Sequence, residues 1–439
     1  MPSIRYFFRL TLAFLSRFKA LIAIGIGLGI LIFLILNIIL PKFGGWETRR
    51  IGLSGRYNTN TLPNNILNMI GNGLTALDKN GNVIPNMAAS WSTPDKGKTW
   101  TFKLKDGLFW QDGKAVISKD IQYQFSDATV TYPDNQTIAF ILLNPYSAFP
   151  SVVTKPVFRS GLLGTGEWKA KNLNLVGDFV DQITLENSKK QRIIYKFYPT
   201  EARLKLAFEL GEVDEVSDLI DPTPLLSWQK VKIIQNTDKG EYVALFFNMN
   251  DKAVGDKNLR QALAYATHKN NLGGERAISP IPENSWAYNP QVKQYTYDQE
   301  KAKSMIDALP DAEKNNLNII LTTSPLLLPQ AEAVQKDWEA AGVKTTLQVI
   351  SNVPASYQAL LAIFDAPDDP DQYSIWHSTQ VQTNITHYSN PRIDKLLEDG
   401  RTTLNIEDRK QIYLDFQRFL VEDSPAIFLY YPTTFTIDR

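Results

Sequence analysis

The chain opens with one long apolar run and then alternates short apolar stretches with polar turns. Residues Ala20–Leu40 read ALIAIGIGLGILIFLILNIIL, in which only Asn37 is polar. As a helix this run would extend about 31 Å, enough to cross the hydrocarbon core of a bilayer. It exceeds the apolar stretch of a cleavable signal peptide and ends in Pro41-Lys42 rather than in a small-residue cleavage site. We therefore expect a retained transmembrane helix over residues 20–40.

Basic residues on both sides of this run set its expected orientation. Four precede it and three follow it closely: Arg5, Arg9, Arg17 and Lys19, then Lys42, Arg49 and Arg50. The positive-inside rule favours, by this small margin, a cytoplasmic segment over residues 1–19. Residues 41–60 are polar and show no period, so we expect a tether there. The rest of the chain would then form a domain outside the membrane, extracellular or periplasmic.

Beyond residue 60 the apolar spacing predicts strands first and strand–helix units later. Apolar stretches flank the turn pair Asn80-Gly81, and even spacing continues to Trp110, which is typical of hairpins. SKDIQYQF predicts a short helix capped by Ser118. Strand-like and helix-like runs then alternate over 192–214, 242–269 and 317–350, before two more helices and the strand-like AIFLYY.

This pattern predicts an α/β fold of two lobes of different make. We expect the first lobe over residues 61–235, with a shortened insertion subdomain at about 78–160. We expect the second lobe over residues 236–439, with a C-terminal crossover to the first lobe that is short or missing.

Composition removes several classes of function. The 46 Lys and Arg residues balance 46 Asp and Glu residues, so there is no basic field for nucleic acid, and we expect no such partner. The chain has no cysteine, which excludes disulfides, thiolate chemistry and a lipid-modified cysteine anchor. Aromatic residues make up 11% of the chain, a content that suits either a capture surface or large cores.

No motif in the chain indicates catalysis or a cofactor. Gly97-Lys98-Thr99 lacks the first glycine of a phosphate-binding loop, and Gly164-Thr165-Gly166 is too short for a dinucleotide fingerprint. There is no GxSxG or HExxH sequence. The dense carboxylate cluster, Asp365, Asp368, Asp369 and Asp371, is interrupted by prolines and lacks the glycine of a calcium loop. We expect no enzyme, no metal and no cofactor, and a solvated loop is the commoner explanation of the cluster.

Several long motifs in order resemble the bacterial extracellular solute-binding proteins of the peptide and nickel class, which serve ABC importers. They are GLTALDKNGNVIPNMAASW, TWTFKLKDGLFWQDGKAVISKDIQYQF, LLGTGEW, FFNMNDKAVGDKNLRQALAYATHKNNL, YTYDQEKAKSMI and the DDPDQY segment with THYSNPRIDKLL after it. In LLGTGEW, Glu167 stands where the family has proline. The resemblance covers nearly all of the chain beyond the apolar run.

This resemblance implies a two-lobed, periplasmic-binding-protein-like clamshell of the peptide-binding class, preceded here by the transmembrane helix. The lobes would close over a peptide or peptide-like solute and present it to the membrane subunits of an ABC importer. In peptide-binding members, an aspartate three residues before an acidic residue followed by proline captures the solute's ammonium group. Here that dipeptide is Asp369-Pro370, and Ala366 occupies the aspartate's position. Asp365 and Asp368 flank Ala366, and either could place a carboxylate oxygen at the same point.

The remaining candidate residues of the binding site are aromatic or polar. Near the same loop, Phe364, Tyr373 and Trp376 could form an aromatic wall or pack beneath the loop. Asn144 and Tyr146 lie where the first lobe would face the cleft. Two other functions stay open: the same fold binding an oligosaccharide or metal chelate without an ammonium anchor, and a sensory or docking module without transport.

Overall fold

The structure is a computed structural model that describes residues 17–20, 24–25, 27–31, 33, 45–314, 317–351 and 356–439. Among these residues, no helix is long and apolar enough to cross a membrane. Most of the predicted span over residues 20–40 lies outside the described residues, as do residues 1–16 of the predicted cytoplasmic segment and residues 41–44 of the predicted tether.

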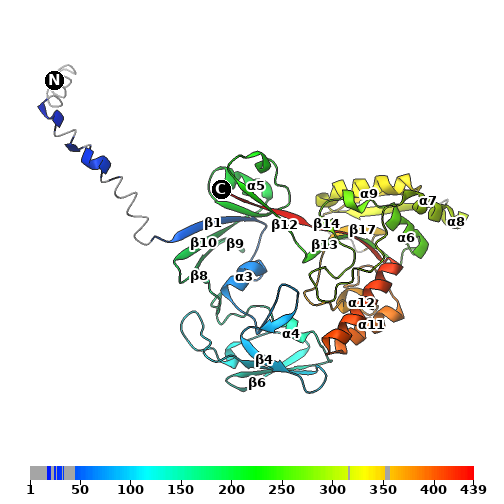
Figure 1. Cartoon of the computed structure of the whole chain (residues 1–439), viewed down its shortest axis with the longest axis horizontal. Coiled ribbons are helices and arrows are strands. Elements are labelled where there is room, and N and C mark those ends of the chain that lie inside the picture. The colour runs from blue at the N-terminus through cyan, green and yellow to red at the C-terminus, as the bar shows by residue number, and fades with distance from the viewer. Residues whose placement is uncertain are drawn as a thin grey trace.

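A seven-stranded mixed sheet forms the base of the first lobe (Figure 1). Its order is β12 (Lys232–Thr237), β19 (Thr433–Asp438), β11 (Glu215–Leu219), β1 (Glu47–Ser54), β10 (Gln191–Tyr198), β9 (Phe179–Glu186) and β8 (Lys169–Val176). Helices α3 (Asn64–Ile70) and α5 (Glu201–Glu209) belong to the same lobe. The expectation of a tether up to residue 60 was wrong, because β1 lies inside this sheet and buries Ile51 and Leu53. The first half of β1 is exposed and polar, and its partners β10 and β11 lie far along the chain, so no apolar period marked it in the sequence.

The insertion subdomain has a sheet and a core of its own. The four-stranded sheet runs β4 (Ala88–Ser92), β5 (Thr99–Leu104), β7 (Thr137–Leu142) and β6 (Ala128–Asp134), beside the hairpin β2 (Thr75–Leu77) and β3 (Val83–Pro85) and the short α4 (Phe149–Val152). Its buried side chains form a separate cluster between Leu74 and Val157. The Gln111 amide joins it to the first lobe by donating to the carbonyl oxygens of Ile70, Gly166 and Trp168, at 3.0, 2.9 and 2.7 Å.

The helix predicted after Ser118 was wrong. Only one 3-10 turn forms, Ser118–Asp120, and the following residues are not helical. The reason is visible in burial: Ile121, Tyr123 and Phe125 pack on the subdomain core, while the residues between them are exposed. A period of two residues fits an extended chain and cannot place all three side chains on one face of a helix.

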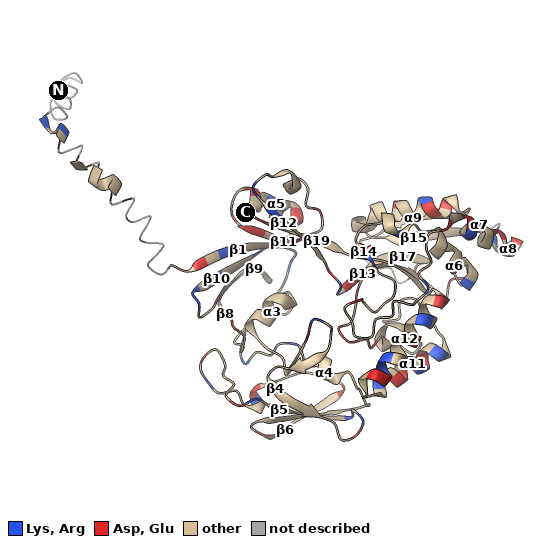
Figure 2. Cartoon of the chain, viewed as in Figure 1, with Lys and Arg blue, Asp and Glu red and all other residues tan. Residues whose placement is uncertain are grey.

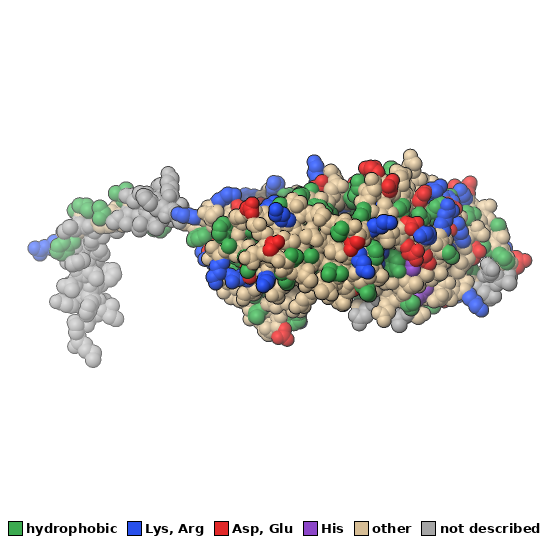
Figure 3. Space-filling model, turned by 90° about the horizontal axis from the view of Figure 1, so that it is seen from below, with side chains coloured by type: hydrophobic (Ala, Val, Ile, Leu, Met, Phe, Trp, Pro, Cys, Tyr) green, Lys and Arg blue, Asp and Glu red, His purple; other side chains and the backbone are tan. Residues whose placement is uncertain are grey.

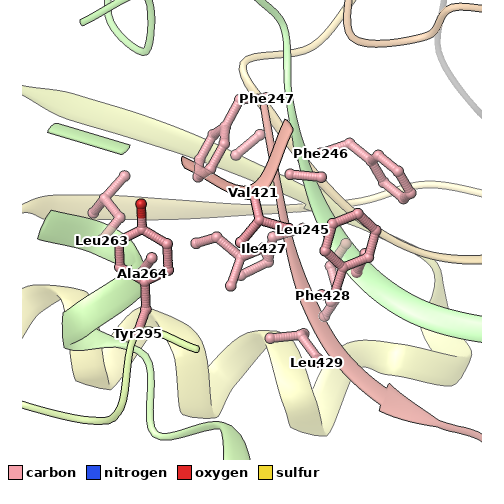
Figure 4. Close-up of a cluster of buried hydrophobic side chains, with 14 of the residues drawn as sticks. Leu245, Phe246, Phe247, Leu263, Ala264, Tyr295, Val421, Ile427, Phe428 and Leu429 are labelled. Atoms are coloured by element: carbon pink, nitrogen blue, oxygen red, sulfur yellow. The ribbon is translucent and has the colours of Figure 1, made fainter. Parts of the chain in front are cut away.

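The second lobe is a six-stranded sheet with helices around it. The sheet runs β14 (Glu275–Arg276), β18 (Ala426–Tyr431), β13 (Glu241–Phe247), β17 (Ala359–Asp365), β15 (Asn318–Thr323) and β16 (Lys344–Val349). The helices are α6 (Lys257–Ala266), α7 (Gln299–Asp307), α8 (Asp311–Lys314), α9 (Leu328–Ala340), α10 (Tyr373–Trp376), α11 (Pro391–Thr402) and α12 (Ile406–Asp423). Side chains of β13, α6 and β18 meet in one continuous core, as Figure 4 shows. The strand–helix alternation predicted from residue 192 onward is confirmed by these elements.

Two short crossovers connect the lobes. Residues 238–240 lead from β12 of the first sheet to β13 of the second, and Pro432 leads from β18 back to β19. The crossovers touch, because the Asp238 amide donates to the Pro432 oxygen at 3.0 Å. The C-terminal crossover is therefore present and short, and the segment 433–438 belongs to the first lobe, not to the second as predicted.

Charged side chains are distributed without a large region of one sign. Acidic and basic residues alternate along α11 and α12 in Figure 2, and both signs are interspersed over the second lobe on the face shown in Figure 3. This distribution agrees with the formal net charge of zero.

Candidate functional site

The loop after β17 carries the carboxylate cluster and lies beside the crossovers. β17 ends at Asp365, opposite Glu241 at the start of β13. The next amide, Ala366, donates to the Gly240 oxygen at 2.7 Å, which fixes the start of the loop against the first crossover. The cluster therefore begins where the two lobes are joined.

Two of the four carboxylates in the cluster are neutralised by arginines. Asp369 and Arg409 are both buried and form a two-point ion pair, with the Nη1 to Oδ2 distance at 2.9 Å. Burial is the largest influence and lowers the pKa of Arg409, but the charges of Asp369 and Tyr413 and the hydrogen bonds to both residues together raise that pKa above its ordinary value. Asp371 accepts from Nε of Arg401 at 2.9 Å. Burial also opposes the charge of Arg401, and Asp371 again raises the pKa. These two carboxylates have structural partners.

The other two, Asp365 and Asp368, form no ion pair with any described residue within the salt-bridge distance. Asp365 is exposed at the end of β17. Asp368 is also exposed but lies closer to the insertion subdomain, since burial raises its pKa while the charge of Lys155 in that subdomain lowers it. The structure thus separates the two candidates for an ammonium anchor by their surroundings.

A pocket of ≈ 540 Å³ opens at Asp365. Its lining residues are Ile363, Phe364, Asp365, Ser374, Ile375, Gln382, Thr383 and Ile385. The neighbouring Glu241 has its pKa raised by burial first, and then by the charges of Asp238 and Asp365. An apolar floor with one exposed carboxylate and a second carboxylate beside it is a suitable receptor for a cationic group attached to an apolar solute.

The three aromatic candidates near the loop have different positions. Phe364 is half-buried and lines the pocket, with its ring 5.8 Å from that of Tyr242. Trp376 is 1% exposed and packs on Phe246, so the structure places it beneath the loop and not on a wall. Its Nε1 donates to Gln372 Oε1 at 3.2 Å, which satisfies the indole in the core. Tyr373 is half-buried at the edge of the core, with its ring stacked 4.0 Å from that of His377.

The structure brings Tyr373 together with Tyr146, one of the two candidates from the first lobe. The Arg401 guanidinium carbon lies 4.2 Å from the centroid of the Tyr373 ring and 4.9 Å from that of Tyr146. Asn144 is exposed just after β7, and no described residue of the second lobe bonds to its side chain. Tyr146 therefore contacts the second lobe, whereas the side chain of Asn144 forms no hydrogen bond with the described residues of that lobe.

Sequence reasoning missed Arg401, Arg409 and Glu241. Arg409 is 40 residues from Asp369, and Arg401 is 30 residues from Asp371. Residues so far apart in the sequence cannot be recognised as ion pairs from their spacing. The only general signal is that buried carboxylates such as Asp369 and Asp371 require basic partners. For Glu241 the signal was its position at the start of a predicted strand next to the lobe boundary.

Among the described residues, no group of three or more His, Asp or Glu side chains is arranged to hold a metal ion. The described site has no nucleophile paired with a base. Two α/β lobes joined by two crossovers, with a pocket beside the junction, define a two-lobed solute-binding protein rather than an enzyme.

Comparison with known proteins makes the assignment specific. Residues 82–384, more than half of the chain, match the model of the bacterial extracellular solute-binding proteins, family 5 (middle region). The chain belongs to this family. It is a binding protein and not an enzyme, and the resemblance found in the sequence motifs is confirmed.

Relatives cover most of the chain. The oligopeptide-binding protein AppA of Bacillus subtilis is 24% identical over 457 residues, spanning 86% of this chain and 83% of AppA. The ABC transporter substrate-binding protein CtaP of Listeria monocytogenes has the same fold, with a TM-score of 0.75, 21% identity and coverage of 90% and 94%. NikZ of Campylobacter jejuni, solved with Ni(L-His), gives a TM-score of 0.71, 22% identity and coverage of 89% and 94%.

Proposed function

We propose that this protein captures a short peptide or peptide-like solute through its ammonium group and delivers it to the membrane subunits of an ABC importer. The proposal rests mainly on Asp365, an exposed carboxylate of the cluster without an arginine partner, which lines a pocket of ≈ 540 Å³. The peptide class is supported by relatives such as AppA, whose name describes oligopeptide binding.

Asp365 is a better anchor than Asp368. Asp368 already faces Lys155 of the insertion subdomain, so a solute ammonium would have to compete with a cation of the protein. Asp365 lies beside Glu241 and its charge helps to raise the pKa of that carboxyl, so an incoming cation would relieve the repulsion between these two carboxylates. Phe364, in the same pocket wall, offers apolar area for the first side chain of the solute.

The test of this function compares free and blocked amino termini. Dipeptides, tripeptides and pentapeptides of alanine would be added to the full-length chain in detergent, alongside the same peptides acetylated at the amino terminus. A bound peptide at 100 times its Kd stabilises the fold by about 2.7 kcal/mol, which raises the thermal midpoint by a few degrees. We expect this shift with the free peptides and its loss on acetylation.

Other outcomes decide between functions. Equal shifts of the thermal midpoint with free and acetylated peptides would support peptide binding but contradict an ammonium anchor. A shift only with nickel–histidine, the solute named for the NikZ structure, would move the function to metal chelates. No shift with any of these probes, on protein that unfolds cooperatively, would contradict solute capture of this class.

We further propose that residues 20–40 hold the protein at the outer face of the membrane. The run is long enough to span a bilayer, and its described residues Ile24, Leu28 and Phe33 expose large apolar side chains. Because the chain has no cysteine, single cysteines can report topology. In intact cells, an impermeant thiol reagent should label Lys230→Cys and leave Ser3→Cys unlabelled. The reverse result, or release of the protein from membranes by alkaline carbonate, would contradict the anchor.

A further inference from the structure

The insertion subdomain and the second lobe meet at Arg401, through residues distinct from the two crossovers. Arg401 lies near the end of α11. Its guanidinium lies between two tyrosine rings that belong to different lobes, Tyr146 and Tyr373. Cation–π contacts of this kind are attractive, and a planar guanidinium can stack on both rings at once.

Three further contacts fix this junction. Asp371 accepts from Arg401 Nε at 2.9 Å, which orients the guanidinium between the rings. The Ser147 amide donates to the Arg401 oxygen at 2.7 Å, and the Ser147 hydroxyl donates to the Gly400 oxygen at 3.0 Å. One residue of the first lobe thus satisfies two carbonyl groups in the last turn of α11, which have no partners within a helix.

Both sides of the junction are supported by rigid structure. On the first-lobe side, the Tyr146 amide donates to the Gly97 oxygen at 3.0 Å, and the Trp100 indole donates to the Tyr146 oxygen at 3.1 Å. On the second-lobe side, Tyr373 directly follows two buried residues, Asp371 and Gln372. A small movement of either lobe would therefore separate the rings from Arg401 rather than bend the support.

We propose that Arg401 acts as an interlobe clasp, which holds the insertion subdomain against the second lobe and stabilises the closed arrangement before any solute binds. The clasp is formed by Arg401, Tyr146, Tyr373, Asp371 and Ser147. Its residues are distinct from those of the crossovers at 238–240 and Pro432, so that the lobes are held at two separate points. The proposal concerns the protein without solute and stands independently of the solute class.

The clasp should also influence the affinity of the protein for its solute. If a solute binds the closed arrangement, its apparent Kd equals the intrinsic Kd divided by the closed fraction. Contacts between the lobes that require no solute increase this fraction. Residues of the clasp would thus tune the affinity for every solute by the same factor, without touching any of them.

The test measures the distance between the lobes without solute. Because the chain has no cysteine, Lys105→Cys on the insertion subdomain and Gln411→Cys on α12 can carry a pair of spin labels, both at exposed positions. We expect one dominant short distance in the parent protein. Arg401→Ala and Tyr146→Ala should each raise the ratio of the long to the short population about tenfold, equivalent to about 1.4 kcal/mol.

Matched variants separate the clasp from general damage. Tyr146→Phe keeps the ring and should leave the distances unchanged, whereas Arg401→Lys keeps the charge but loses the planar stack and should fall between the parent and Arg401→Ala. Arg418→Ala removes an exposed arginine from α12 and should have no effect. If Arg401→Ala fails to fold, Tyr146→Ala on the opposite lobe carries the test. Unchanged distances in folded Arg401→Ala and Tyr146→Ala would overturn the proposal.

Discussion

The two ends of the loop from Asp365 to Trp376 have opposite character. At the end next to the crossovers, Asp365 is exposed, lines a pocket and lies beside the carboxyl group of Glu241. A few residues further on, Asp369 and Asp371 are buried and held by arginines of α12 and α11. One short acidic sequence thus contains both a candidate recognition group and structural ion pairs. The partner supplied by the fold, not the local sequence, decides which role each carboxylate has.

The largest effect is expected at the buried end. Asp369→Asn leaves the Arg409 charge buried without a counter-charge, so the free energy of unfolding should fall by about 3 to 5 kcal/mol in urea denaturation. The matched control is Asp415→Asn, which breaks the exposed pair with Arg418 and should cost less than about 1 kcal/mol. Equal, small losses in both variants would show that Asp369 is not a structural residue.

Trp376 provides a second test of the same contrast, with an effect of similar size. As a core residue, Trp376→Ala should lower the free energy of unfolding by about 3 to 5 kcal/mol. Chemical denaturation followed by circular dichroism would measure the change. Were Trp376 part of the solute wall, the variant would keep its stability and lose only solute affinity.

A smaller effect is expected for Asp371→Asn. Arg401 keeps 33% of its side-chain exposure, so water compensates part of the lost ion pair, and we expect a loss of about 1 to 2 kcal/mol. The same variant should lengthen the interlobe distance, because Asp371 orients the clasp arginine. A loss of stability with an unchanged interlobe distance would show that Asp371 stabilises the second lobe but does not contribute to the clasp.

The smallest effect concerns Glu241 at the exposed end. Its pKa is raised in the folded state by burial and then by Asp238 and Asp365, so the folded protein binds this proton more tightly than the unfolded chain. Ionisation of Glu241 therefore destabilises the fold, and Glu241→Gln should be more stable than wild type at neutral pH, by less than about 1 kcal/mol.

The pH profile checks the sign of this effect. The advantage of Glu241→Gln should vanish below the ordinary glutamate pKa of 4.5, where Glu241 is protonated in both states, and grow as the pH rises through the raised folded value. The matched control is Glu209→Gln, the same substitution at an exposed position of α5. A variant less stable than wild type at neutral pH would contradict the repulsion among these carboxylates.

Periodicity in the sequence predicted most of the second lobe correctly, because β13, α6 and α9 are long enough to show their period. It failed for β1, whose first half is exposed and polar and whose partners are distant strands, and for the segment after Ser118, where tertiary packing of Tyr123 overrode a helical pattern. The site was only partly predictable. The acidic cluster was visible in the sequence, but the arginines that divide it come from 30 and 40 residues away and are selected by the packing of α11 and α12 on the loop.

The most direct measurement is calorimetric titration of one peptide with a free amino terminus into the wild type, Asp365→Asn and Asp368→Asn. The account predicts that Asp365→Asn weakens binding by about tenfold to a hundredfold, the loss of a charge-assisted hydrogen bond, while Asp368→Asn changes the Kd by less than about threefold. The opposite ranking, or equal affinities in all three proteins, would contradict Asp365 as the residue that captures the solute.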